Sequence, residues 1–384
     1  MTRFLLFFVC MCLCGCTSHK NKKEIINRQD FKKICTEFNV NLTSIQPLGQ
    51  GNCNQTYLVN SSDGKRYVLQ QLQQTNETDV ARLMNNIGLI SSYLIEKTLK
   101  SHGNPDKEVL NFLRAKSGKF YYKNGDKFYR MYKFIDDVIT PELVDVSTFA
   151  EVGRGFGKFA NLLADFPADK LYETYPNFHN TPVRLEQLLQ AVKDNKANRL
   201  NKVQKELREY QKYANKYANI LMQALQQQKI PYRVVHNDTK ADNILIDKTT
   251  KKALCVIDYD TIMPGSILFD YGDALRAGAS TAKSDEKDLS KVHFDMNKFK
   301  VFTKAYLNEL GSSITQNEKE LMPVSVLIIT MECGMRFLTD YLNGDVYFNI
   351  KYKEHNLNRM RTQLKLVQEI EKNIPEMTKI IKSL

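Results

Sequence analysis

The residues best suited to chemistry lie in one short segment beyond the middle of the chain. Asp238 follows an apolar run, Asn243 comes five residues later, and Asp258 ends the next run with strand character. Phosphoryl transfer needs a carboxylate that takes the proton of the attacking hydroxyl, and oxygen ligands for the metal ions that neutralise phosphate charge. The spacing therefore predicts Asp238 as the base and Asn243 with Asp258 as the ligands of Mg²⁺.

The full segment, His236-Asn-Asp-Thr-Lys-Ala-Asp-Asn243, has the spacing of the catalytic loop in protein-kinase-like enzymes. Asp and Asn also build ordinary turns, and each residue taken singly fits that structural interpretation. Because four positions match together between runs of strand character, the catalytic interpretation is favoured. We expect His236 to support the loop from a buried position rather than to carry a proton.

Three segments of the first third are candidates for binding ATP. Gly49-Gln-Gly51 is a turn whose glycines would let the backbone approach phosphates closely, although a plain hairpin turn has the same composition. Met131 and Tyr132 lie where strands give way to helices, so their backbone would hold adenine if this is a hinge and not an edge strand. The lysine that kinases carry on the third strand is missing, and Gln70 or Gln71 stands there. Either another cation replaces it, or ATP binding is weaker or lost.

The elements that must position these residues divide the chain in two. Residues 41–72 alternate like a β-meander with an Asp63-Gly64 hairpin turn, and residues 79–99 have helical spacing. Further strand-like segments are expected at 109–116, 120–122 and 128–134. Helices dominate beyond Pro141, including one long helix over 200–228, and only the loop strands interrupt them. We predict an α+β, protein-kinase-like two-lobed fold: a nucleotide-binding lobe over 24–134 and a catalytic and substrate-binding lobe over 135–384.

Composition narrows the class of partner. Hydrophobic residues make up 42% and charged residues 26% of the 384, as in ordinary folded proteins. The net charge of +12 comes from lysines spread along polar helices, which indicates a solvated surface and not a nucleic-acid groove. Cys35, Cys53, Cys255 and Cys333 stand alone and predict buried thiols without disulfides. We expect a monomer that binds a small molecule.

The first residues of the chain indicate a different cellular location. Arg3 and the apolar run over 4–15 are typical of a secretory signal, and Cys16 is placed like the lipidated cysteine of a lipoprotein, with 1–23 as signal and tether. Lipidation of Cys16 would anchor the protein at a membrane outside the ATP pool. Either the working chain starts near Lys22 and is cytoplasmic, or the exported protein uses its fold for something other than ATP turnover.

Beyond these motifs, residues 38–364 resemble bacterial N-acetylhexosamine 1-kinases of the aminoglycoside phosphotransferase group. The matching stretches are the glycine turn with Thr56-Tyr57, Arg130 to Ile135, Phe178 to Thr181 with Arg184, His236 to Asn243, Val256 to Gly265, Asp270 to Asp273, and Arg336 to Asp345. That family transfers phosphate from ATP to the anomeric hydroxyl of GlcNAc or GalNAc.

The resemblance also implies roles for single residues. Arg336 and Tyr347 would contact the sugar, and Asp270 with Asp273 would brace the catalytic loop. Gln70 is the usual residue of that family at the strand position, whereas Gln71 is a departure. Two alternatives remain open: a kinase for another hydroxyl compound, such as an aminoglycoside or choline, and a lipid-anchored binding protein that has kept the fold without catalysis.

Overall fold

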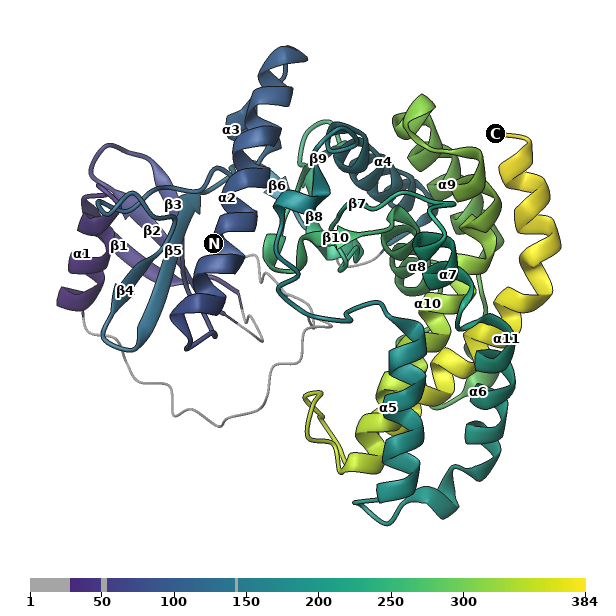
Figure 1. The fold of residues 1–384 in the computed structure, drawn as a ribbon. Coiled ribbons are helices and arrows are strands. Elements are labelled where there is room, and N and C mark those ends of the chain that lie inside the picture. The colour runs from purple at the N-terminus through teal and green to yellow at the C-terminus, as the bar shows by residue number, and fades with distance from the viewer. Residues whose placement is uncertain (1–27, 50–53, 142–143) are drawn as a thin grey trace.

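The computed structural model describes residues 28–49, 54–141 and 144–384, so Gly51 and Cys16 lie outside the described residues. Figure 1 shows a β-sheet flanked by helices at the N-terminal side and a larger, mainly helical body that contains the C-terminus. The α+β two-lobed prediction is confirmed.

The small lobe is built on an antiparallel sheet in the order β1-β2-β3-β5-β4. Its strands are β1 (Leu42–Pro47), β2 (Gln55–Ser61), β3 (Arg66–Gln71), β4 (Tyr122–Asn124) and β5 (Lys127–Lys133). Helix α1 (Arg28–Glu37) packs on one face over a core that includes Leu69 and Met131. Since side chains alternate along a strand, Gln70 and Arg130 face the opposite side of the sheet.

Helix α2 (Glu77–Lys100) joins the small lobe to the large one. Its buried apolar residues recur at helical spacing from Val80 to Leu94. Asn86 is fully buried in the middle of this face, and its amide nitrogen donates to the carbonyls of Tyr172, at 2.8 Å, and Ile262, at 3.1 Å. A buried amide that finds both acceptors in the other lobe fixes the position of α2 over the large lobe.

The large lobe is helical around two small sheets that carry the predicted loop. The sheets pair β7 (Arg233–Val235) with β10 (Met263–Gly265), and β6 (Val138–Ile139) with β8 (Ile244–Asp247) and β9 (Ala253–Val256). The helices are α3 (Pro105–Glu108, between the lobes), α4 (Val146–Leu162), α5 (Thr181–Asp194), α6 (Gln204–Tyr217), α7 (Ile220–Gln226), α8 (Ile267–Gly278), α9 (Met296–Leu310), α10 (Gln316–Asn343) and α11 (His355–Lys382).

Several expected elements differ from the observed ones. The single helix expected over 200–228 is a 3-10 turn followed by α6 and α7, which a turn at Ala218 and Asn219 separates. Residues 109–116, expected as a strand, contribute only an isolated bridge from Phe112 to Tyr132. Helices α1 and α8 were not predicted.

Helix α10 is the one helix in the described part of the chain that is long and apolar enough to cross a membrane. Its most apolar window is 89% buried inside the protein. It packs against α5, α8 and α11, so its apolar character serves the core of the large lobe.

Helices α4 and α9 cross closely because Gly153 lies at their contact. A Cβ added at Gly153 would stand 2.6 Å from the backbone oxygen of Phe302, which cannot move aside easily. We predict that Gly153→Ala destabilises the protein by about 1–3 kcal/mol, since overpacking outweighs the gain of roughly 1 kcal/mol in helix propensity. Gly155→Ala is the matched control, because its Cβ would meet side-chain atoms of Ile244 and Ala253 and no backbone atom, with the nearest contact at the tip of Ile244. Urea unfolding of both variants measures the difference, and equal stability would contradict the prediction.

Candidate active site

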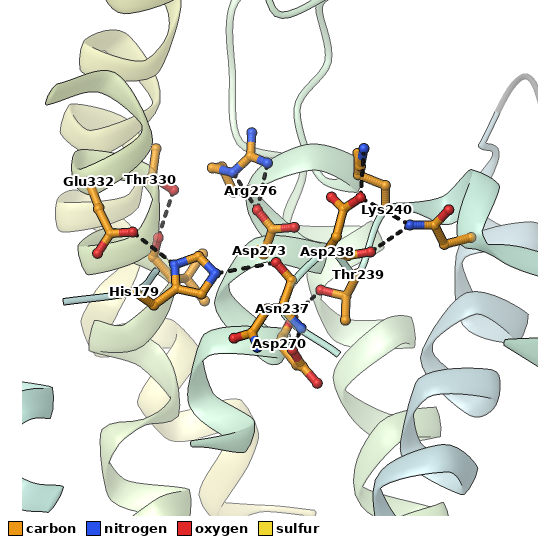
Figure 2. Close-up of polar contacts among 12 residues, drawn as sticks. His179, Asn237, Asp238, Thr239, Lys240, Asp270, Asp273, Arg276, Thr330 and Glu332 are labelled. Atoms are coloured by element: carbon orange, nitrogen blue, oxygen red, sulfur yellow. Dashed lines mark hydrogen bonds and ion pairs between the residues drawn. The ribbon is translucent and has the colours of Figure 1, made fainter. Parts of the chain in front are cut away.

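One carboxylate of α8, Asp270, accepts hydrogen bonds from the backbone of the predicted catalytic loop. Asp270 accepts the backbone N–H of His236 at 2.8 Å and that of Asn237 at 2.6 Å, while its own carbonyl accepts the Thr239 hydroxyl at 2.6 Å (Figure 2). Burial raises the pKa of Asp270 to about 6, against the lowering effect of these hydrogen bonds. The resemblance implied this bracing role, and the contacts place Asp270 directly under the loop.

His236 uses both ring nitrogens within the loop. Nε2 lies 2.8 Å from the carbonyl oxygen of Ile257, so this nitrogen carries the hydrogen, and Nδ1 accepts the backbone N–H of Asp238 at 3.3 Å. The ring is fully buried. With one nitrogen donating and the other accepting, His236 links the catalytic loop to the end of β9 and is not placed to exchange protons with a substrate.

Asp238 is buried between two partners on its own loop. Lys240 Nζ lies 3.0 Å from Oδ2, and Asn243 Nδ2 donates to the same oxygen at 3.2 Å and to the Asp238 carbonyl at 2.7 Å. Oδ1 is buried and makes no hydrogen bond. Burial raises the pKa of Asp238, and the Lys240 charge opposes that rise. A buried carboxylate oxygen without a donor fits a base that waits for the proton of a hydroxyl group.

Asp258 and Asn243 are brought side by side by strand pairing. Ile244 pairs with Val256, and the Asn243 carbonyl accepts the Ile257 N–H at 2.9 Å. Asp258 has a positive φ of 63°, which ends the strand and starts a 3-10 turn. Since the Asn243 amide nitrogen points to Asp238, its amide oxygen is the atom that a cation would meet.

The charges around Asp258 fit a divalent cation. Burial, followed by the nearby Asp260 and Asp238, raises the pKa of Asp258. Within the described ranges no group of three His, Cys, Asp or Glu is arranged to hold a metal. Magnesium commonly takes one or two protein carboxylates or amides and completes its shell with phosphate oxygens and water. Asp258 and Asn243 are suited to that shared coordination, which requires the nucleotide.

The residues predicted to bind the nucleotide, Gly49, Met131 and Tyr132, have different surroundings in the structure. Gly49 has a φ of 72°, a conformation that glycine adopts at no steric cost, and it precedes a segment that is not described. Met131 is fully buried under α1, and its carbonyl accepts the Leu113 N–H at 2.8 Å, so its side chain lies on the sheet face away from Arg130. Tyr132 is half-buried and packs against Phe112, with ring centroids 5.0 Å apart. Strand β5 ends after both residues.

Gln70 lies in a polar row that crosses the sheet. Its amide nitrogen donates to Thr56 Oγ1 at 3.1 Å, and its amide oxygen accepts from Arg130 Nε at 2.8 Å. The Arg130 guanidinium forms a buried ion pair with Asp260. The neighbouring Gln71 faces the other way and accepts from the Tyr129 hydroxyl at 3.2 Å.

A second buried pair, His179 with Glu332 of α10, also supports the catalytic loop. His179 Nδ1 lies 2.8 Å from Glu332 Oε1, and its Nε2 lies 3.4 Å from the Asn237 carbonyl (Figure 2). The Thr181 hydroxyl donates to Glu332 Oε2 at 2.7 Å. Burial alone would raise the pKa of Glu332, but the His179 and Arg184 charges hold it below its usual range. This contact ties α10 to the residue before Asp238.

Arg336 lies one turn after Glu332 on α10, and its side chain contacts Tyr347 in the loop that follows this helix. Arg336 Nη2 donates to the Tyr347 hydroxyl at 3.1 Å, and the guanidinium lies 5.4 Å from the centre of the Phe178 ring. The carboxylate of Asp340 accepts the backbone N–H groups of residues 346–348 at 2.8–2.9 Å and so folds the loop that carries Tyr347. Since Phe178 precedes His179, this pair lies beside the catalytic loop.

Asp273 differs from Asp270 in its partners. Its carboxylate receives two hydrogen bonds from Arg276 on the same helix, at 3.0 and 2.6 Å. Burial alone would raise the pKa of Asp273, and the Arg276 charge lowers it below its usual range. Asp273 therefore contributes charge near Asp238, while Asp270 makes the direct contacts with the loop.

Four residues of this site were not singled out from the sequence as site residues: Lys240, Arg130, Asp260 and the pair partner Glu332. Lys240 stands inside the quoted loop motif, so its spacing from Asp238 was a usable signal. The partners of Arg130 and Glu332 lie more than a hundred residues away in the chain, and no local pattern indicates them.

Comparisons with known proteins bear on the fold and the family. The fold is similar to an aminoglycoside phosphotransferase from Alicyclobacillus acidocaldarius (TM-score 0.62, 11% identity, 96% of this chain and 99% of that one). It is also similar to an amicoumacin kinase in complex with AMP-PNP and Ca²⁺ (0.57, 14%, 91% and 94%) and to the Plasmodium vivax ethanolamine kinase (0.51, 13%, 83% and 81%). The model of the phosphotransferase enzyme family matches residues 44–291, well over half of the chain. The chain therefore belongs to the phosphotransferase enzyme family.

Proposed function

We propose that this protein transfers the γ-phosphoryl group of ATP to the anomeric hydroxyl of an N-acetylhexosamine, GlcNAc or GalNAc. Asp238 accepts the proton of the sugar hydroxyl as its oxygen forms a bond to phosphorus, the bond between phosphorus and the β,γ-bridging oxygen breaks, and ADP leaves. Mg²⁺ bound with Asn243 and Asp258 would supply charge neutralisation on the phosphates.

The choice of acceptor rests on the charges beside the loop. The two carboxylates of α10 in this region are both satisfied internally: Glu332 by His179 and Thr181, and Asp340 by backbone N–H groups. Arg336 remains as a buried cation with aromatic neighbours. A cationic aminoglycoside or choline would need an acidic pocket, whereas an arginine can donate to the amide carbonyl of a neutral acetamido sugar.

Use of ATP also bears on location. We infer that the working protein acts in the cytoplasm, where ATP is available. The alternative, anchoring through Cys16, concerns residues outside the described ranges.

An acceptor panel tests the proposal. The full chain is assayed with ATP and magnesium against GlcNAc, GalNAc, glucose, choline and kanamycin, and the sugar 1-phosphate is detected directly. We expect turnover with the acetamido sugars and little with the others. Phosphorylation of kanamycin or choline would replace the sugar proposal by the other small-molecule kinase, and no turnover with any acceptor would favour a non-catalytic binding protein.

Arg336→Met sharpens this assay. Loss of a charged donor to the substrate is expected to lower kcat/KM for the acetamido sugar by about 10- to 100-fold, with the KM for ATP unchanged. Arg208→Met, which alters an exposed arginine of α6, is the control. An equal loss for ATP and sugar would indicate a general structural role for Arg336.

A further inference from the structure

The small lobe carries no lysine at the strand position that serves nucleotide phosphates in kinases. Gln70 occupies that position on β3, and a neutral amide cannot supply positive charge. In the register of the sheet Gln70 is paired with Arg130 on β5, and Arg130 Nε donates to Gln70 Oε1 at 2.8 Å. The strand position is thus neutral, and a guanidinium lies directly beside it.

Arg130 belongs to a network that spans both lobes. Its guanidinium pairs with Asp260, two residues after the predicted metal ligand Asp258. The other Asp260 oxygen accepts from the Asn54 amide nitrogen at 2.9 Å, and Asn54 Oδ1 accepts the Gln73 N–H at 3.1 Å. Asn54 is the first described residue after the glycine turn. The network therefore joins Asn54 at the start of β2, the strand position on β3 and the turn that carries Asp258.

The burial of Arg130 requires a reason. Only 2% of the residue is exposed, and a buried charge that is not functionally needed is commonly replaced by apolar residues without loss of stability. The Arg130 guanidinium pairs with Asp260, which follows Asp258 by two residues in the same 3-10 turn. Its position beside a metal-binding carboxylate is where the phosphates of a bound nucleotide must lie, because the metal bridges protein and phosphate oxygens.

We propose that Arg130 is the residue that supplies positive charge to the phosphates of the bound nucleotide, in place of the missing strand lysine. Gln70 is its positioning residue, since it fixes the guanidinium through Nε, and Asp260 is the counter-ion. This rests on the proposed use of ATP and is independent of the acceptor. The alternative is that Arg130 and Asp260 act only as a clamp between the lobes, and the two roles make opposite predictions.

Binding of adenosine, ADP and ATP to the full chain, measured by calorimetry without metal and then with magnesium, separates these roles. For Arg130→Met we expect ADP and ATP to bind about 10- to 100-fold more weakly, with adenosine within about twofold of wild type, because only the phosphates lose a charged partner. Arg130→Lys should recover part of the loss. Arg114→Met, an exposed small-lobe arginine whose side chain contacts Gly118 in its own turn, is the control.

Asp260→Asn keeps the test decisive even if Arg130→Met does not fold. If Arg130 serves phosphate, removal of its counter-ion leaves metal-free ADP affinity unchanged or higher. If the pair is only a clamp, Asp260→Asn weakens ADP as Arg130→Met does, and adenosine falls together with ADP; either result would overturn the proposal. Failure of the wild-type protein to bind ADP at all would overturn the use of ATP itself, whereas normal ADP binding by folded Arg130→Met would refute only the role of Arg130.

Discussion

Asp238→Asn is expected to lower the rate of phosphoryl transfer by about 10²- to 10⁴-fold, the usual contribution of a general base. Asparagine keeps the shape of the side chain but cannot accept the proton of the attacking hydroxyl. The buried Oδ1, which has no donor in the protein, is the atom that this substitution disables. Single-turnover measurement of the transfer step checks the expectation.

The same variant should remain folded and bind nucleotide. Burial raises the pKa of Asp238, so the folded state disfavours the charged carboxylate at neutral pH, and a neutral amide removes that cost. We therefore expect a thermal midpoint equal to or above that of wild type and an unchanged dissociation constant for ADP. Asp242→Asn, in the same loop and only half-buried, is the matched control. Retention of more than about a tenth of the wild-type rate by Asp238→Asn would refute Asp238 as the base.

Asp258→Asn is expected to remove the effect of magnesium. In wild type, magnesium should strengthen ATP binding, because the ion neutralises charge between carboxylate and phosphate. In Asp258→Asn this strengthening should be lost, and the transfer rate should fall by about 10²- to 10⁴-fold, since the metal supplies several kcal/mol of charge stabilisation. Titration of ATP with and without magnesium measures the first effect. If magnesium strengthens ATP binding equally in both proteins, Asp258 is not a ligand.

The pH dependence of metal binding gives an independent check on Asp258. Burial and neighbouring carboxylates raise its pKa from 3.8 to about 7. Because the metal binds the ionised carboxylate, magnesium affinity should fall about tenfold per pH unit below pH 7 and level off above it.

Without metal, the stability of the folded protein should change with pH in the opposite direction to magnesium affinity. A raised pKa means that the folded state holds the proton more tightly than the unfolded state, so the contribution of Asp258 to stability is present below pH 3.8 and is lost as the pH rises to about 7. Thermal unfolding at pH 5 and pH 8, with and without magnesium and ATP, tests this. We expect ligands to stabilise the protein more at pH 8, and the difference between the two pH values to shrink in Asp258→Asn.

The centre of the site could be predicted because its parts are close in the chain. His236, Asp238, Asn243 and Asp258 lie on one loop and the two strands that leave it, so their spacing and the apolar runs around them indicate both structure and chemistry. Local pairing of β8 with β9 then places Asn243 beside Asp258. The same locality made the β-meander and most helices predictable, since their periodicity and turn residues are short-range properties.

Errors arose where tertiary contacts override local pattern. Residues 200–228 have continuous helical spacing, yet α6 and α7 are separate helices, because the chain turns at Ala218 and Asn219 between them. Met131 was predicted to hold adenine through its backbone, and this stays a prediction. What the sequence did not show is that alternation along β5 directs the Met131 side chain under α1 and gives the opposite face to Arg130.

The sequence by itself determined the fold class, the family and the loop that carries Asp238, because these depend on residue spacing within short segments. Only the tertiary structure decided how that loop is supported and how charge is supplied around it. The contact of His179 with Glu332 and that of Arg130 with Asp260 each join residues far apart in the chain, and both pairs are buried. Such pairs form only when distant elements pack together and exclude water, a condition that no local pattern of residues encodes.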